Sequence, residues 1–419
     1  MAGLDDGDEP SKGVRAPTRR YEARRSAILA SAVTEINARG VRGMTLADVA
    51  ARLGLVPTGV IYYFKNKEEL AAACFLRGIE RFEQLIADAA AASDDRARLL
   101  AFVHGYLEFK RRAELGEAEQ IAIFNDARAL GAPAVGEAFI GMFRAARRLV
   151  KGPPGAPLPR LDRSARTHLL LSELFWSVAW LETTDVEDYG RVADRVAAVL
   201  ADGLLPRCGR WPQVGVLPLT ADGDPDAGAS AEQFLRAATE LINEEGYHGA
   251  SVERISARLN VSKGAFYHHN ATKDDLVVAC FQRTFQIVWR AIRASEAEGG
   301  TGLEVLARAC VALAHHQLAG RLPLLRTSAL TAVPEAINAE LTREFDRISL
   351  RIASVICDGI ADGSIRPVDV NVAGQLVTGM INAAADLKHW AAELTPDDVA
   401  ARYVRPLFEG LLSPAAAAD

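Results

Sequence analysis

Two stretches of the chain place hydroxyl, aromatic and basic side chains in similar patterns. In the first stretch, Val60 and Phe64 are four residues apart, so at helical spacing both point to the same side and into a core. That arrangement leaves Thr58, Tyr62 and Tyr63 on or near the outer face. Hydroxyl groups hydrogen-bond phosphates or base edges, and aromatic edges contact thymine methyl groups. This face therefore suits a reader of the DNA major groove.

The second stretch repeats the first at a constant offset of 206 residues. The offset holds without a gap from Ala32, which matches Ala238, to Phe75, which matches Phe281. A repeat of this length is far longer than the roughly 20–50 residues of a solenoid unit, so each copy is large enough to be a set of domains. The face equivalent to the first one presents Lys263, Gly264, Tyr267, His268 and His269.

Positive charge is concentrated in the first copy. The whole chain has a net charge of −6, yet residues 12–67 contain eleven basic and three acidic side chains. Residues 230–273 contain five of each and are neutral. A local basic patch on an acidic protein is expected for a nucleic-acid-binding module attached to a body that does not bind DNA. We therefore expect the second copy to bind DNA less strongly than the first.

Helices must position these residues. Apolar residues recur at every fourth position before Gly40 and Gly246, which we expect to end the two first helices. Thr45 and Ser251 have the side chains of N-cap residues and precede short helices. A turn of two to three residues then leads into another short helix. Helix, tight turn and helix form the outline of a helix-turn-helix unit.

The rest of each copy has helical spacing and no strand signal. We expect an all-α fold with two tandem copies of a three-helix head, each followed by a body of about six helices. Expected helices of the first body lie near 68–90, 96–112, 117–129, 133–150, 164–183 and 187–204, and those of the second near 274–296, 302–318, 322–331, 334–361, 370–392 and 396–412. The expected domains are a disordered basic arm (1–20), head 1 (21–67), body 1 (68–205), a linker (206–229), head 2 (230–273) and body 2 (274–412).

Several function classes lack their sequence signals. The five cysteines are scattered and form no CxxC pair or metal-ligand spacing, and no phosphate loop or nucleophile elbow is present. We therefore expect no enzyme activity, metal or cofactor. No run of about 18 apolar residues occurs, and the acidic N-terminus does not resemble a secretion signal, so we expect a cytoplasmic protein without a membrane partner.

The windows 45–70 and 251–276 resemble the TetR family of transcriptional regulators. Each combines a hydroxyl residue, an Ala-Arg-Leu run, a turn, an aromatic cluster and a Lys-acid-acid-Leu end. The resemblance implies phosphate contacts from Thr45, Ser251, Lys67 and Lys273. With the outer-face residues, the predicted DNA-binding set is Thr45, Thr58, Tyr62, Tyr63 and Lys67 in head 1, and Ser251, Lys263, Gly264, Tyr267, His268 and Lys273 in head 2.

Three positions depart from the family pattern. Thr58 replaces a frequent glycine, and Ile61 replaces a tyrosine that usually contacts a phosphate. Asn270 replaces the aromatic core residue that Phe64 supplies in the first copy, and a buried amide costs about 1–3 kcal/mol unless it finds partners. These differences predict unequal heads and an asymmetric pair of half-sites.

The resemblance also implies that each body senses a ligand whose binding changes the separation of the heads. Candidate pocket residues are Tyr106, Phe124, Trp176 and Trp180 in the first body and His315, His316, Arg326 and Trp390 in the second. Aromatic residues at helical spacing pack in a core more often than they line a pocket, and a histidine pair on a helix is more often partly exposed or already hydrogen-bonded than part of a ligand site. The expected effector is a small molecule whose class the sequence does not give.

These features predict a DNA-binding transcriptional regulator, most simply a repressor that a small molecule releases from double-stranded operator DNA. In the family, the last two helices of each unit form a four-helix dimer interface. Because one chain holds both partners, we expect an intramolecular pseudo-dimer with two heads, and a homodimer with four heads is the alternative. In a second functional hypothesis, only head 1 binds DNA and the second half is a sensor or protein-interaction module.

Overall fold

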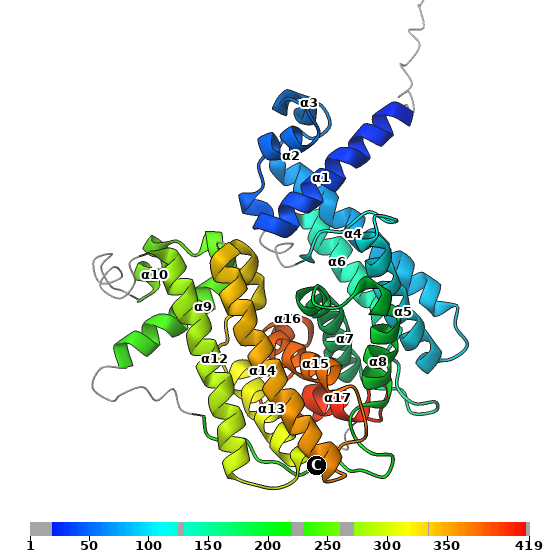
Figure 1. Ribbon diagram of the computed structural model, residues 1–419, viewed down its shortest axis with the longest axis vertical. Helices are drawn as coiled ribbons and strands as arrows, with labels where there is room; N and C mark the ends of the chain where they lie inside the picture. Colours follow the sequence, from blue (N-terminus) through cyan, green and yellow to red (C-terminus); the bar gives the residue numbers. More distant parts are fainter. Residues whose placement is uncertain (1–18, 125–129, 220–228, 260–271, 334, 416–419) are drawn as a thin grey trace, which may run out of the picture.

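The computed structural model describes residues 19–124, 130–219, 229–259, 272–333 and 335–415 (Figure 1). Within these ranges every regular element is a helix and no strand occurs, which confirms the all-α prediction. None of the described helices combines the length and apolar character needed to cross a membrane.

The first unit, residues 19–205, begins with three helices that form head 1. Its elements are α1 (Arg19–Gly43), α2 (Leu46–Arg52), α3 (Pro57–Ile61), α4 (Lys67–Ala90), α5 (Asp95–Glu114), α6 (Pro133–Ala146), α7 (Arg160–Leu181), the 3-10 turn η2 (Val186–Asp188) and α8 (Tyr189–Asp202). The body helices are amphipathic and pack their apolar faces on a core that is rich in aromatic residues.

The second unit, residues 229–412, repeats this order. Its elements are α9 (Ala229–Gly249), α10 (Val252–Leu259), α12 (Lys273–Ala297), α13 (Gly302–Leu318), the 3-10 turn η3 (Thr327–Ala332), α14 (Glu335–Ala361), α15 (Val370–Ala383), the 3-10 turn η4 (Ala384–Asp386), α16 (Leu387–Trp390), the π-helical turn η5 (Ala400–Val404) and α17 (Arg405–Glu409). In Figure 1 head 1 lies at the top, and α9 and α10 lie on the left.

Both first helices bend at the predicted glycines. Gly40 has a φ of 68° and Gly246 a φ of 73°, in the left-handed region that favours glycine, and a short helical turn follows each of them. The chain therefore leaves α1 and α9 where the sequence predicts an end, but it turns once more before the next helix begins.

The segments 117–129 and 322–331 were expected to be helical. Their first parts, up to Phe124 and Arg326, are loops. The Asn37 side chain donates a hydrogen bond to the carbonyl of Ile121 (3.0 Å) and accepts one from the amide of Ile123 (2.9 Å). In the second unit Asn243 bonds the carbonyl of Leu324 (2.8 Å) and the amide of Arg326 (3.0 Å) in the same way. These loop groups bond a side chain from the head instead of a helical neighbour, so the head overrides the local helix preference.

The helix expected at 396–412 is also modified. Its first part is the π-helical turn η5 and its second part is the short helix α17. Pro406 has no backbone N–H and cannot donate to the preceding turn, which accounts for the change in helix type at this point.

The two units pack on each other through α7, α8, α15 and α17, with η5 (Figure 1). The amide of Leu204 donates to the carbonyl of Phe408 (2.7 Å), and the amide of Leu411 donates to the carbonyl of Leu200 (2.8 Å). Gly203 and Gly410 allow this approach, because a Cβ on either one would lie 2.1–2.2 Å from a carbonyl oxygen of the other unit. The backbones of the two units are therefore in direct contact.

Charged side chains cross the same contact in reciprocal pairs. Arg402 bonds Asp162 at 2.6 Å, and Arg195 pairs with Asp369. Asp369 and Arg402 stand 207 residues after Asp162 and Arg195, so the two pairs are equivalent. The offset in the heads is 206, so the second unit is one residue longer between the head and this contact. The pairing therefore has approximate twofold symmetry.

An arginine from each unit also binds backbone carbonyls of the other, Arg366 at the C-terminal end of α8 and Arg166 in the segment that follows α17. Arg166, which is 1% exposed, donates to the carbonyls of Leu411 (3.1 Å) and Pro414 (3.1 Å). Arg366 donates to the carbonyls of Ala198 (3.0 Å) and Gly203 (2.8 Å) at the end of α8. A cation at a helix C-terminus satisfies carbonyls that have no helical partner and interacts favourably with the helix dipole.

Candidate nucleic-acid interface and inter-unit cavity

Local sequence determines the shape of head 1. Thr45 caps α2, as predicted, because its hydroxyl oxygen accepts a hydrogen bond from the amide of Asp48 (3.1 Å). Gly54, with a φ of 64°, makes the turn, and Pro57 occupies the first turn of α3, where its missing N–H costs nothing. Val60 and Phe64 are buried in the head core, as their spacing predicts.

The opposite face of α3 is open to solvent. Tyr62 is 74% exposed and Ile61 is 46% exposed, and Thr58 is also exposed. Tyr63 is half-buried and its ring lies 4.7 Å from that of Tyr21, which also contacts Tyr62 edge-on at 6.2 Å. The predicted residues Thr58, Tyr62 and Tyr63 therefore belong to one face of head 1.

Tyr21 is a member of this face that the sequence reasoning missed. It stands at the start of α1 among the exposed arginines Arg19, Arg20 and Arg24. The contact with Tyr62 brings that basic cluster beside the aromatic face. Its position inside the basic run was a usable signal, because aromatic and basic side chains together are typical of nucleic-acid-binding surfaces.

The remaining predicted contacts of head 1 lie at helix starts. Thr45 is exposed, and its hydroxyl donates to the carboxylate of Asp48 at 2.7 Å. Lys67 is the first residue of α4 and is half-buried. A phosphate contact from Thr45 would exchange its bond to Asp48 for one to the phosphate oxygen.

Head 2 is described only in part. Ser251 accepts a hydrogen bond from the amide of Arg254 (3.3 Å), in the manner of an N-cap residue, and Lys273 is the first residue of α12. Thr272 and Asp275 form a capping box at the same helix start. The other predicted residues, Lys263, Gly264, Tyr267 and His268, lie outside the described residues, as do His269 and Asn270.

One ion pair has its positive and negative residues exchanged between the two heads. In head 2, Arg254 bonds Glu245 (2.6 Å) and Arg258 bonds Glu244 (2.7 Å). The positions that match Arg254 and Glu245 in head 1 are Asp48 and Arg39, which lie 3.6 Å apart, so this pair has its charges exchanged between the heads. The arginines of α10 are thus already paired with carboxylates of α9.

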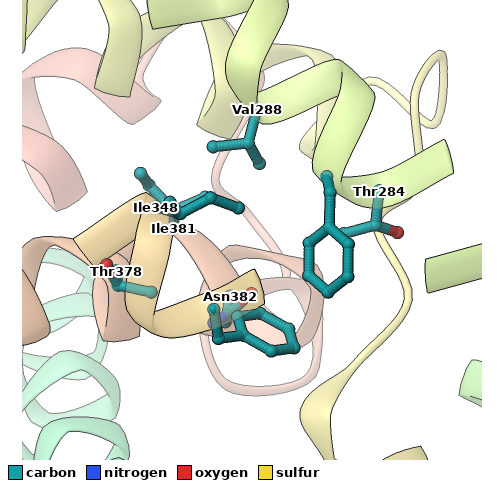
Figure 2. A pocket seen from close by; sticks show the side chains of 8 residues that line it. Thr284, Val288, Ile348, Thr378, Ile381 and Asn382 are labelled. Atoms are coloured by element: carbon teal, nitrogen blue, oxygen red, sulfur yellow. The ribbon is translucent and has the colours of Figure 1, made fainter. Parts of the chain in front are cut away.

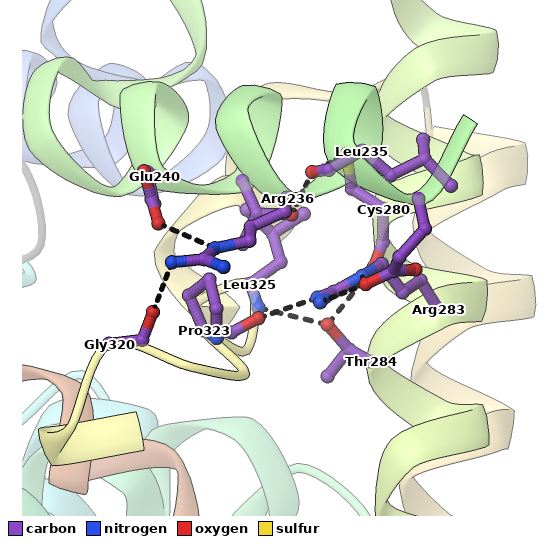
Figure 3. A network of polar contacts seen from close by, with 11 residues as sticks. Leu235, Arg236, Glu240, Cys280, Arg283, Thr284, Gly320, Pro323 and Leu325 are labelled. Atoms are coloured by element: carbon purple, nitrogen blue, oxygen red, sulfur yellow. Dashed lines mark hydrogen bonds and ion pairs between the residues drawn. The ribbon is translucent and has the colours of Figure 1, made fainter. Parts of the chain in front are cut away.

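A network of polar contacts fastens α9 to body 2 (Figure 3). Arg283 is 4% exposed and bonds Glu232 (2.6 Å) and the carbonyl of Pro323 (2.8 Å). Arg236 donates to the carbonyl of Gly320 (2.6 Å). Thr284 accepts from the amide of Leu325 (2.9 Å). The loop held by Asn243 is therefore fixed to the head and to the body at once.

A cavity of about 780 Å³ lies between the units. Its walls come from α6 and α7 of the first unit and from η3, α14, α15 and α16 of the second. The ends of both first helices reach it, with Asn37 and Gly40 from α1 and Asn243 and Gly246 from α9. Ligand sites for drug-sized molecules have volumes of about 300–1,000 Å³, so this space is large enough for one.

A small cavity of about 10 Å³ lies within the second body between α12, α14 and α15 (Figure 2). Thr284, Val288, Ile348, Thr378, Ile381 and Asn382 surround it. This volume holds at most a single water. An effector at this point would therefore have to displace packed side chains.

The predicted pocket residues divide into two groups. Phe124, Trp176, Arg326 and Trp390 line the inter-unit cavity, where Arg326 bonds Asp386 at 2.8 Å. Tyr106, Trp180, His315 and His316 do not belong to its lining.

The residues of the second group are buried in the core or hydrogen-bonded to backbone carbonyls of other segments. Tyr106 is 2% exposed and lies 5.3 Å from the ring of Phe82, and Trp180 is 6% exposed. His316 lies 2.9 Å from the carbonyl oxygen of Leu217 and so fastens the linker, while His315 lies 3.1 Å from that of Pro396. Sequence periodicity does not separate such packing residues from lining residues.

Comparisons with known proteins follow the same division of the chain. The family model "Bacterial regulatory proteins, tetR family" matches residues 28–74 and again residues 234–280, and the model "Tetracyclin repressor-like, C-terminal domain" matches residues 299–411. The repeated match supports a tandem arrangement.

Individual relatives match parts of the chain. The Transposon Tn10 TetC protein of Escherichia coli is 38% identical over 52 residues, which are 12% of this chain and about a quarter (26%) of TetC. The Fatty acid metabolism regulator protein of Bacillus subtilis is 28% identical over 157 residues, 36% of this chain and 78% of that protein. Among solved structures, the TetR family transcriptional regulator PfmR of Thermus thermophilus is 22% identical, with a TM-score of 0.37, over 43% of this chain and 98% of PfmR.

Proposed function

The chain belongs to the TetR family of bacterial transcriptional regulators and carries two such units in tandem, and from this premise we propose that it is a cytoplasmic repressor whose heads bind operator DNA until a small-molecule effector releases them. Relatives such as UidR of Escherichia coli, which is 26% identical over 148 residues, are also named as transcriptional regulators. Sequence-specific DNA binding is the common function that these names imply.

The observation that carries the proposal is the outer face of head 1. Tyr62 is the most exposed large hydrophobic side chain of the described residues, and Tyr21 joins it to an arginine cluster. Exposed aromatic surface has a cost in water unless a partner covers it. Arginines attract the phosphate backbone and fix the orientation of a protein on DNA, and the aromatic and hydroxyl groups then face the groove.

We infer further that the functional assembly is an intramolecular pseudo-dimer. The reciprocal ion pairs and backbone bonds between α7–α8 and α15–α17 support it, because they join the two units as a dimer interface would. Gly379 adds to this support, since a Cβ there would lie 2.5 Å from Oε2 of Glu173. The corresponding position of the first unit is Ser172 or Glu173, and both carry a Cβ, so two first units would fit together less well.

The two heads contribute unequally in this proposal. Head 1, with the arginine cluster at the start of α1, supplies most of the electrostatic affinity, and head 2, which is neutral over residues 230–273, adds less. The alternative in which head 2 has left DNA binding altogether is favoured by one further observation: among the described residues head 2 places two carboxylates, Glu244 and Glu245, on the inter-unit cavity, whereas the lining residues of head 1 are uncharged. In that case the second half acts as a sensor.

A footprint on the intergenic DNA beside the gene tests the proposal. Two unlike protected half-sites on one face of the DNA, about one helical turn or more apart, are expected if both heads bind. One protected half-site would support the sensor alternative. If no DNA is protected at any salt concentration, the repressor proposal is wrong. Light scattering of the same sample should give a mass near 45.0 kDa for the pseudo-dimer, and twice that mass for a homodimer with four heads.

A further inference from the structure

The inter-unit cavity has features that point to a particular ligand chemistry. Six phenylalanine and tryptophan residues contribute to its apolar wall. Phe139 and Phe143 extend from α6, and Trp390 extends from α16 of the other unit. The rings of Phe143 and Trp390 are stacked with centroids 4.1 Å apart, and that of Phe139 lies 5.5 Å from Trp390. Aromatic faces bind apolar groups and also attract cations, by about 0.5–2 kcal/mol for each contact.

The charges of the lining are mostly negative. The lining contains four carboxylates and one guanidinium. The carboxylates are those of Glu182, Glu244, Glu245 and Asp386, and the guanidinium is that of Arg326, which Asp386 already binds. Glu182 is exposed and interacts electrostatically with Lys110. Oε1 of Glu245 bonds Arg254, and its Oε2 is buried without a hydrogen-bond partner among the described residues. A buried carboxylate oxygen without a donor is costly, so this atom indicates where a donor or a positive charge would be stabilised.

We propose that this cavity is a ligand site that takes one organic cation with a bulky aromatic body per chain. The aromatic wall would hold the body, and the carboxylates of Glu182 and Glu245 would face the charge. The amide nitrogen of Asn382, buried on the same lining with no hydrogen-bond partner among the described residues, offers a donor to an oxygen atom of the ligand. The unequal walls make the site asymmetric, so its stoichiometry is one.

The position of the cavity gives the ligand a direct way to move the heads. Gly40 and Gly246, the bends of α1 and α9, both line it. So do Asn37 and Asn243, which hold the loops before the body helices. A ligand between these points would act as a wedge between the two heads. This effect on DNA rests on the proposed function, whereas binding itself does not.

Calorimetry on the full chain tests the site with two probes of equal shape and opposite charge. Tetraphenylphosphonium should bind with one molecule per chain, and tetraphenylborate should bind at least tenfold more weakly. Equal binding of the two ions, two sites per chain, or no binding of the cation would each overturn the proposal.

Variants locate the binding site. Glu245→Gln should weaken cation binding about tenfold, and the control Glu240→Gln, on the same helix but outside the lining, should leave it unchanged. Glu245 also pairs with Arg254, so its loss could loosen head 2. Glu182→Gln, directly after the end of α7, is therefore a second test and should weaken cation binding severalfold. If neither lining variant differs from the control, the cation binds elsewhere and the assignment is wrong.

A DNA-binding assay then separates the two proposals. The cation should lower the affinity of the wild-type protein for its footprinted DNA, and this effect should be smaller in Glu245→Gln. Cation binding with the expected stoichiometry but unchanged DNA affinity would uphold the site and refute effector-driven release. A footprint without cation binding would uphold the regulator and refute the site.

Discussion

Gly410→Ala tests the contact between the two units most directly. Gly410 has a φ of 93°, and a Cβ at this residue would lie 2.2 Å from the carbonyl oxygen of Ala201 in the other unit. The left-handed conformation alone costs an alanine about 1–2 kcal/mol. Moving the two backbones apart adds about 1–3 kcal/mol, as for other overpacked interiors. We therefore expect a total loss of about 2–5 kcal/mol in the free energy of unfolding.

The matched control is Gly363→Ala. Gly363 has a similar φ of 81°, but a Cβ there would have no atom within 4 Å, so only the conformational cost of about 1–2 kcal/mol applies. Urea unfolding followed by tryptophan fluorescence measures both variants. Trp211 reports on the site itself, because its ring lies 5.2 Å from that of Phe408. Equal losses in the two variants would show that the backbones of the units do not approach each other at Gly410.

Three further predictions follow from charge and burial. Lys67→Ala should reduce the slope of log affinity for DNA against log salt by about one, and an equal reduction from Lys273→Ala in a salt titration would contradict the sensor alternative for head 2. Burial raises the pKa of Glu173 well above its ordinary value of 4.5. The folded state therefore holds this proton more tightly than the unfolded state does, and the free energy of unfolding falls as the pH rises above 4.5. Glu173→Gln should therefore stabilise the protein more at pH 8 than at pH 5, and an equal effect in urea unfolding at both pH values would refute a buried carboxyl. In the native protein an aromatic disulfide reagent should modify only the exposed thiols Cys208 and Cys357, since burial raises the pKa of the other three, and five rapidly reacting thiols would contradict the packing.

The parts of the fold that follow local rules could be predicted from the sequence. Thr45 caps a helix because a hydroxyl next to a free amide is a local arrangement, and Val60 and Phe64 are buried because their spacing matches one helix turn. The loop at 117–123 could not be predicted in this way. Its helical composition is overridden by Asn37, which is 84 residues from Ile121 in the sequence.

The candidate sites show the same limit. The outer face of head 1 was accessible to prediction because its residues lie on α3 or in the turn that directly follows it, with only Tyr21 added from elsewhere. The cavity was not, because its walls come from α6 and α7 of one unit and from η3 and α14–α16 of the other. Phe124, Trp176 and Arg326 were identified as aromatic or charged residues on helices, but nothing in their spacing brings the first two near the third.

Fusion of the two units in one chain explains why such a site can exist at all. In a dimer of identical chains, every substitution appears on both sides of the twofold axis. The two walls of a cavity on that axis therefore always have the same residues. Here Arg39 and Asp48 of head 1 correspond to Glu245 and Arg254 of head 2, with the charges exchanged. That exchange places a glutamate on the cavity on one side only. Because the pair is neutral in both heads, the exchange leaves the net charge of the head unchanged, and in our proposal its effect is on the charge that the cavity presents to a cation.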